Sequence, residues 1–258
     1  MDNQSFMNPN HVPDEFKVPY DIIDLPSQGI LYPNKKSSVK VEYITASDEN
    51  ILSSPNIIAN NNGLDILLKR KVKDLGFDLD QLLEGDRIAI LLYLRSTAFG
   101  PDYTQLVLNE KREIVEGIID LSQLKYKNLT INPDEKGEFD FELPYSKKKV
   151  KFRLLSGKDE KELKEIDEKI KPQNDGLSSI ETLRLERSIM EVDGVRDKLK
   201  IAYSLKNNSI KLMDVRSLKK YVTEIEPGID LKTKARIQGG DPVDCFLKIG
   251  GSFWFPEI

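Results

Sequence analysis

The segment Gly85-Asp86-Arg87-Ile88-Ala89-Ile90-Leu91-Leu92-Tyr93-Leu94 has apolar side chains on nearly every side of a helix from Ile88 onward. A helix that is hydrophobic all round is buried, so we expect it to be the most buried element of the N-terminal half. After Gly100-Pro101 the pattern changes to two short strand-like runs, 104–109 and 114–121, which a polar turn joins into a hairpin. A buried helix followed directly by antiparallel strands predicts an α+β protein.

Helical and strand patterns are interleaved on both sides of this segment. We expect an α+β fold with mostly helical N-terminal and late-middle parts, a small antiparallel β unit in the middle and a C-terminal β-hairpin. The expected regions are a flexible arm at 1–17, an N-terminal α+β region at 18–100, the small antiparallel β unit at 101–156, a helical region at 157–226, and C-terminal β strands at 227–258.

Apolar spacing and capping residues place the individual elements. Helices are expected at 48–53 with Ser47 as N-cap, at 158–170, at 178–191, and from Asp214 as N-cap through Ile225. Further strands are expected at 39–44, 129–131, 139–143, 150–154, 232–237, 245–249 and 253–255.

The composition excludes several classes of protein. The 258 residues include 39 Lys+Arg and 43 Asp+Glu, a net charge of −4, whereas a general nucleic-acid binder has a clear basic excess. Cys245 is the only cysteine and His11 the only histidine, which excludes an intrachain disulfide, a cysteine zinc site and a Ser–His–Asp triad. No apolar run reaches the ~18 residues of a membrane span, and residues 1–16 do not resemble a signal peptide. We therefore expect a reduced cytoplasmic protein with no metal, cofactor, nucleic acid or catalytic residue.

Residues 95–103 are a candidate partner-binding segment, because aromatic, glycine and charged residues follow the buried helix abruptly. Arg95, Phe99 and Tyr103 are the candidate contact residues. The alternative is a helix C-terminus that Gly100 caps and that Phe99 and Tyr103 pin to the core. The sequence leaves both interpretations open.

Trp254 is the fourth candidate contact residue. In an extended strand, Phe253 and Phe255 point to one face and Trp254 to the other. Either both faces are filled by the core, or the phenylalanines fill the core and Trp254 contacts a partner.

The lysine run 147–149, with Lys151, is compatible with a phosphate or nucleic-acid site. Such runs are usually solvated faces, and no stacking aromatic residues interleave with this one.

Several segments together resemble the baseplate hub assembly protein family of T4-like contractile-tailed bacteriophages. The ordered set spans roughly 18–258 and is strongest in the first hundred residues. The segments that resemble the family are Leu25-Pro26-Ser27-Gln28-Gly29-Ile30-Leu31-Tyr32, 45–52, 54–56, 65–68, Gly85-Asp86-Arg87, 94–103, 141–144, 152–157, 214–227 and the final Phe-Trp-Phe-Pro.

The resemblance implies a non-enzymatic tail protein that binds other baseplate or tail proteins during hub assembly in the host cytoplasm. Such a protein either stays in the virion baseplate or leaves after assembly. Where the family has Cys-x-x-Cys pairs, this chain has 106–109 and 240–245, with only one cysteine between them, so a zinc hairpin is not expected. The alternative function is a carboxylate-based cell-wall hydrolase of the tail, because two catalytic carboxylates need to converge only in space.

Overall fold

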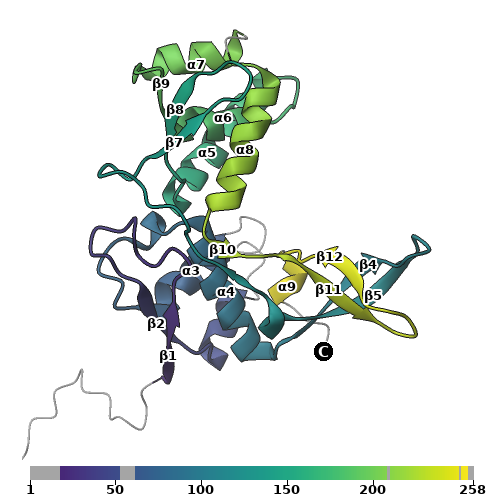
Figure 1. Ribbon diagram of the computed structural model, residues 1–258. Coiled ribbons are helices and arrows are strands. Elements are labelled where there is room, and N and C mark those ends of the chain that lie inside the picture. The colour runs from purple at the N-terminus through teal and green to yellow at the C-terminus, as the bar shows by residue number, and fades with distance from the viewer. Residues whose placement is uncertain (1–17, 53–61, 208–209, 250, 255–258) are drawn as a thin grey trace, which may run out of the picture.

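The computed structural model describes residues 18–52, 62–207, 210–249 and 251–254. Its elements form a central body, an upper lobe of helices around a small sheet, and a lateral sheet that projects from the body (Figure 1). The α+β class is confirmed, because several small antiparallel sheets lie beside helices that pack through one hydrophobic core.

The N-terminal body contains a three-stranded antiparallel sheet, so the expectation of a mostly helical N-terminal part is wrong. Its strands are β1 (Tyr20–Asp24), β2 (Ser38–Glu42) and β3 (Val72–Lys73). Val39 and Val41 alternate with half-buried residues in β2, and this period of two favours a strand with one face in the core.

Three helices complete the body: α1 (Glu49–Leu52), α3 (Asn62–Lys71) and α4 (Glu84–Phe99). A 3₁₀ turn at Ala46–Asp48 precedes α1, and its N-cap is Thr45 rather than the expected Ser47. The Asp48 side chain accepts from the Thr45 backbone and forms a capping box. Helix α4 is the buried helix that the opening segment predicts, with five apolar residues under 7 % exposed: Ala89, Ile90, Leu91, Leu92 and Leu94.

The lateral sheet has the strand order β12-β11-β5-β4, all antiparallel. Its strands are β4 (Asp102–Leu108), β5 (Ile114–Asp120), β11 (Lys232–Ile237) and β12 (Val243–Phe246). Both expected hairpins are therefore present, but they pair with each other. The strands expected between 101 and 156 do not form one unit, because β7 and β8 belong to a different sheet.

The upper lobe contains the sheet β7-β8-β9, formed by Phe139–Glu142, Lys149–Phe152 and Ile189–Val192. Around it lie α5 (Gly157–Ile170), α6 (Ile180–Ser188), α7 (Lys198–Lys206) and α8 (Leu212–Ile225). The helix expected at 178–191 ends at Ser188, because the next four residues pair with β8. Helix α7 lies within the helical region expected at 157–226, although the sequence did not mark it as a separate helix.

Two further expectations about the upper lobe and its connections are wrong. No strand forms at 129–131; the nearest one is β6 (Tyr126–Lys127), which pairs with β10 (Gly228–Ile229). Asp214 is not the N-cap of α8, which is Lys211. Asp214 lies in the first turn, where its buried carboxylate accepts from the backbone of Tyr145 and Ser146.

The chain end is helical where a strand was expected, since α9 spans Gly251–Trp254. Phe253 and Trp254 are both buried. Phe255 and the 1–17 segment lie outside the described residues. None of the helices in the described ranges has the length and hydropathy needed to cross a bilayer.

Candidate protein-binding surface

Arg95 lies at the centre of a buried aromatic cluster rather than on a surface. The residue is 2 % exposed, and its guanidinium carbon is 4.8 Å from the ring centroid of Phe99, 5.9 Å from Tyr103 and 5.6 Å from Phe253. Nε donates to the Phe253 carbonyl oxygen at 2.7 Å. Burial lowers the pKa of the guanidinium, and the three rings supply favourable cation–π contacts. The cluster joins α4, β4 and α9.

The other three sequence-predicted contact residues belong to the same cluster. Tyr103 and Trp254 are each 4 % exposed, and Phe99 is half-buried. Gly100 ends α4 with a φ of 85°, which corresponds to the helix-end interpretation of this segment. Trp254 packs edge-on against Phe253 instead of pointing to solvent. Of the two alternatives for Trp254, the outward one is wrong and the buried one holds; the strand on which both were based is a helix, in which side chains do not alternate between two faces.

The segments that resemble the phage family meet at the N-terminus of α4. The buried Asp86 carboxylate accepts from the Ser27 backbone at 2.9 Å, from Ser27 Oγ at 2.5 Å, and from the Tyr32 hydroxyl. The Tyr32 oxygen in turn accepts from the Leu83 backbone N–H at 3.0 Å. Burial raises the pKa of Asp86, and the hydrogen bonds from Ser27 and Tyr32 offset this only in part. Residues 25–32 and 85–87 are therefore one structural contact.

The neighbours of Asp86 extend this contact to the upper lobe. Gly85 lies against β10 so closely that an added Cβ would be 1.9 Å from the Pro227 carbonyl oxygen. Arg87 pairs with Asp65, and Lys161 of α5 bridges Asp65 at 2.7 Å. These motif residues hold the body and the upper lobe together and are not exposed for binding.

The exposed apolar residues lie elsewhere, on one face of the lateral sheet that we call the outer face. In the β4–β5 hairpin, Leu108 is opposite Ile114 and Leu106 is opposite Glu116. Ile114 is 71 % exposed, and Leu106, Leu108 and Ile118 are exposed on the same side. The opposite, inner face is buried, with Tyr103, Val107 and Ile119 in the core. An exposed apolar patch with a polar rim is typical of a protein interaction site.

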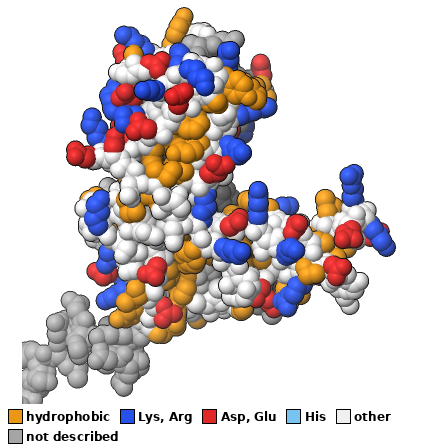
Figure 2. Space-filling model, in the orientation of Figure 1, with side chains coloured by type: hydrophobic (Ala, Val, Ile, Leu, Met, Phe, Trp, Pro, Cys, Tyr) orange, Lys and Arg blue, Asp and Glu red, His pale blue; other side chains and the backbone are white. Residues whose placement is uncertain are grey.

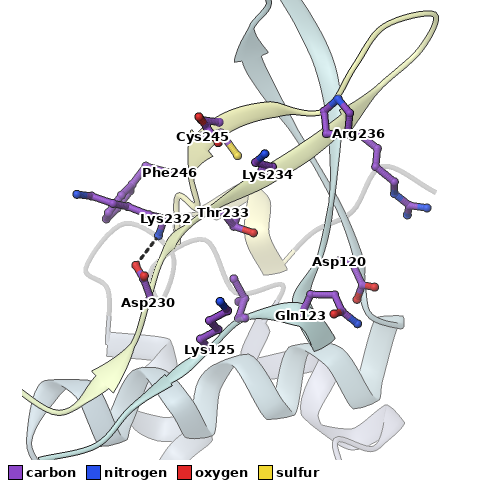
Figure 3. Close-up of a pocket in the computed structure, with 13 residues that line it drawn as sticks. Asp120, Gln123, Lys125, Asp230, Lys232, Thr233, Lys234, Arg236, Cys245 and Phe246 are labelled. Carbon is purple, nitrogen blue, oxygen red and sulfur yellow. Dashed lines mark hydrogen bonds between the residues drawn. The ribbon is translucent and has the colours of Figure 1, made fainter. Parts of the chain in front are cut away.

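The other two strands continue the outer face with basic residues and one aromatic. Lys232, Lys234 and Arg236 follow one another along β11, and Ile118 pairs with Arg236. Lys232 is opposite Phe246, which is 55 % exposed. The residues drawn in Figure 3 line an open groove of about 1000 Å³ between β11, β12 and the 120–125 segment; they include Thr233 and Cys245, which alternate with the outer-face residues of these strands.

Charges at the base of the outer face are partly paired. Arg236 Nη2 lies 2.8 Å from Asp102 Oδ1, and both side chains are about 60 % exposed. Hydrogen bonds from Ser122 lower the pKa of Asp120. Burial raises the pKa of the Cys245 thiol, so it is protonated at neutral pH and is not an activated nucleophile. The groove can bind charged and apolar groups, and its carboxylates are solvated.

Buried carboxylates elsewhere have structural partners. Asp48 pairs with Lys71, Asp159 with Arg153, and Asp167 accepts from Ser178 and Ser179. Burial alone would raise the pKa of Asp159, but hydrogen bonds from Arg153 and Ser156 outweigh it and lower the pKa. Within the described ranges, no three His, Cys, Asp or Glu side chains lie close enough to hold a metal ion.

Comparisons with known proteins add no relative: no family model, no curated protein and no solved structure matches this chain. The outer face was missed at the sequence level because both faces of β4 and β5 contain apolar residues. The sequence did contain one indication of this surface. Leu106, Leu108 and Ile114 lie close to the tip of the expected hairpin, and two strands alone cannot bury the apolar surface of all three.

Proposed function

We propose that this chain is a non-enzymatic tail protein of a contractile-tailed bacteriophage and takes part in baseplate hub assembly by binding other tail components. The site that we propose for this binding is the outer face of the lateral sheet. It replaces the candidate contact residues Arg95, Phe99, Tyr103 and Trp254, for which the sequence left a structural role equally open. Assembly in the host cytoplasm, followed either by retention in the virion or by release, belongs to the same proposal.

One observation supports the binding function most: four aliphatic side chains are exposed together on a hairpin that extends beyond β11 and β12. A partner that covers them gains about 25 cal/mol per Å² of apolar surface removed from water. The neighbouring Arg236 and Phe246 are residue types that are enriched at protein interfaces. The phage assignment is supported by the ordered motifs alone.

The test uses phage-infected cells in which the natural protein is replaced by Leu106→Thr/Ile114→Thr. Threonine keeps the strand preference of both positions and removes most of their apolar surface. We expect the variant to fold and melt like the unmodified protein, since both residues are exposed, and to co-purify with tail intermediates at least tenfold less. Sedimentation of the unmodified chain with mature virions distinguishes retention from release.

The matched control is Leu177→Thr, a substitution of an equally exposed leucine in the loop after α5. It should leave co-purification unchanged. Equal losses from both variants, or no loss from the hairpin variant, would refute binding through the outer face. Degradation of peptidoglycan by the purified chain would instead support the hydrolase alternative.

A further inference from the structure

Helix α7 exposes an apolar pair at the far end of the upper lobe. Leu199 and Tyr203 are four residues apart, so they lie on one face of the helix. They are 83 % and 69 % exposed, whereas Ile201, on the opposite side, is buried in the core. Lys200 lies beside the pair, Lys206 follows it on the same face one turn beyond Tyr203, and both lysines are exposed. The outward side of α7 is therefore a short apolar stripe with a lysine beside it and a lysine at its C-terminal end.

Neighbouring elements extend the same surface. The β7–β8 turn is held against the first turn of α8 by hydrogen bonds from Tyr145 and Ser146 to Asp214. We call the combined set the apical surface. It consists of the half-buried Lys148 and the exposed residues Tyr145, Lys147, Lys149, Leu199, Lys200, Tyr203, Lys206, Lys211, Leu212 and Met213.

The cationic character of the apical surface is only partly neutralised. Lys147 pairs with Glu142 at 3.9 Å and Lys206 with Glu186 at 3.2 Å. Asp193 and Asp197 also lie at this end, where they accept backbone hydrogen bonds from Lys149 and Leu199. Figure 2 shows blue, red and apolar side chains interspersed at the upper end of the molecule. The lysines of the apical surface outnumber these carboxylates, and this excess favours an anionic partner.

Residue types distinguish a membrane from a protein as that partner. Lysine is depleted at protein–protein interfaces, where arginine supplies most of the positive charge. Here lysine supplies most of the positive charge: Arg196 is engaged with Glu138 and Glu191, and the exposed Arg216 lies one turn further along α8. Lysines that border Leu and Tyr are typical of helices that lie in the headgroup region of a bilayer, since their long side chains reach out to the phosphates.

We propose that the apical surface binds anionic phospholipid bilayers, with Leu199 and Tyr203 entering the headgroup region and the surrounding lysines contacting lipid phosphates. This function is independent of the proposed protein binding by the lateral sheet, which lies at a different end of the molecule (Figure 1).

The experiment is flotation of the full chain with vesicles of equal parts phosphatidylglycerol and phosphatidylcholine. We expect binding at low salt, at least tenfold weaker binding to pure phosphatidylcholine, and release as salt shortens the range of the attraction. Lys200→Glu/Lys206→Glu should reduce binding more than tenfold, since each lysine near the surface contributes about fivefold. Leu199→Ser/Tyr203→Ser should reduce binding while it leaves the melting temperature unchanged.

The matched control is Lys232→Glu/Lys234→Glu on the lateral sheet, which should float like the unmodified chain. Trp254 is the only tryptophan and is buried, so its emission reports whether vesicles unfold the protein. The proposal fails if anionic vesicles do not bind or phosphatidylcholine binds equally well. It also fails if the control loses binding too, Trp254 becomes exposed, or poly-glutamate binds as tightly as vesicles of equal charge.

Discussion

The two faces of the lateral sheet contain similar side chains but have different surroundings. On the inner face, Tyr103 packs edge-on against Phe253 with 4.9 Å between ring centroids, and Ile119 is fully buried. On the outer face, Ile114 and Phe246 are exposed to solvent. Apolar character alone therefore does not show which face of a strand is core. The inner face is expected to determine stability, and the outer face to determine binding.

The largest expected difference is between two phenylalanines. Phe253→Ala removes a fully buried ring and should lower the free energy of unfolding by about 3–5 kcal/mol. Phe246→Ala makes the same chemical change on the outer face and should cost about 0.5 kcal/mol or less. Urea denaturation of both variants measures this, and equal losses would show that the outer face is also core.

Two adjacent positions of β5 sharpen the comparison. An added Cβ on Gly117 would lie 2.7 Å from Val107 Cγ2 and 2.8 Å from Ala235 Cβ. Gly117→Ala should therefore overpack the inner face and cost about 1–3 kcal/mol. Glu116→Ala, one residue earlier and on the outer face, should change stability by about 0.5 kcal/mol at most. If Gly117→Ala melts at the temperature of the unmodified chain, the inner face has more room than the described packing allows.

The reaction rates of two thiols compare the exposure of the two faces without a measurement of stability. Burial raises the pKa of Cys245, so little of it is the reactive thiolate at pH 8. The thiol of Asp244→Cys in a Cys245→Ser background lies on the exposed outer face and should react with iodoacetamide at least about fivefold faster. Rates that differ less than twofold would place both side chains in similar surroundings.

The smallest expected effect is a pH dependence at the base of the outer face. Hydrogen bonds from Ser122 lower the pKa of Asp120 below its ordinary value of 3.8. A carboxylate with a lowered pKa stabilises the fold above about pH 4, and this contribution disappears as the pH falls through the lowered pKa. Asp120→Asn should cost less than about 1 kcal/mol at pH 7, because solvent screens the site, and progressively less as the pH falls through the lowered pKa. If the free energy lost on Asp120→Asn grew as the pH fell, the result would contradict this prediction.

Local patterns predicted the elements that depend on local spacing. Helix α4, the β4–β5 hairpin and the β11–β12 hairpin follow from apolar runs between turn residues. Pairing between distant segments did not follow, because nothing near Ile118 in sequence indicates that Arg236 lies beside it. Long-range pairing also explains why the helix expected at 178–191 is shorter in the structure. The helix ends at Ser188 because the following residues pair with β8.

The candidate site shows the same limit. The sequence singled out Arg95, Phe99 and Tyr103 as a group, and they do cluster. It did not indicate that Phe253 closes the cluster from the far end of the chain. When the contact with Phe253 is unknown, the sequence around Arg95 does not show whether this arginine is buried or exposed.

The pairing of β5 with β11 also determines when the lateral sheet can exist. Ile118 and Arg236 are more than a hundred residues apart in the chain. At about 5–20 residues per second, a ribosome needs roughly 5–25 s to make the intervening chain. Until then the β4–β5 hairpin has no neighbouring strand, and its inner face lacks the contact between Tyr103 and Phe253. A partner that recognises Leu106 and Ile114 alone could bind during synthesis, whereas one that also requires Arg236 and Phe246 must wait until β12 has been made.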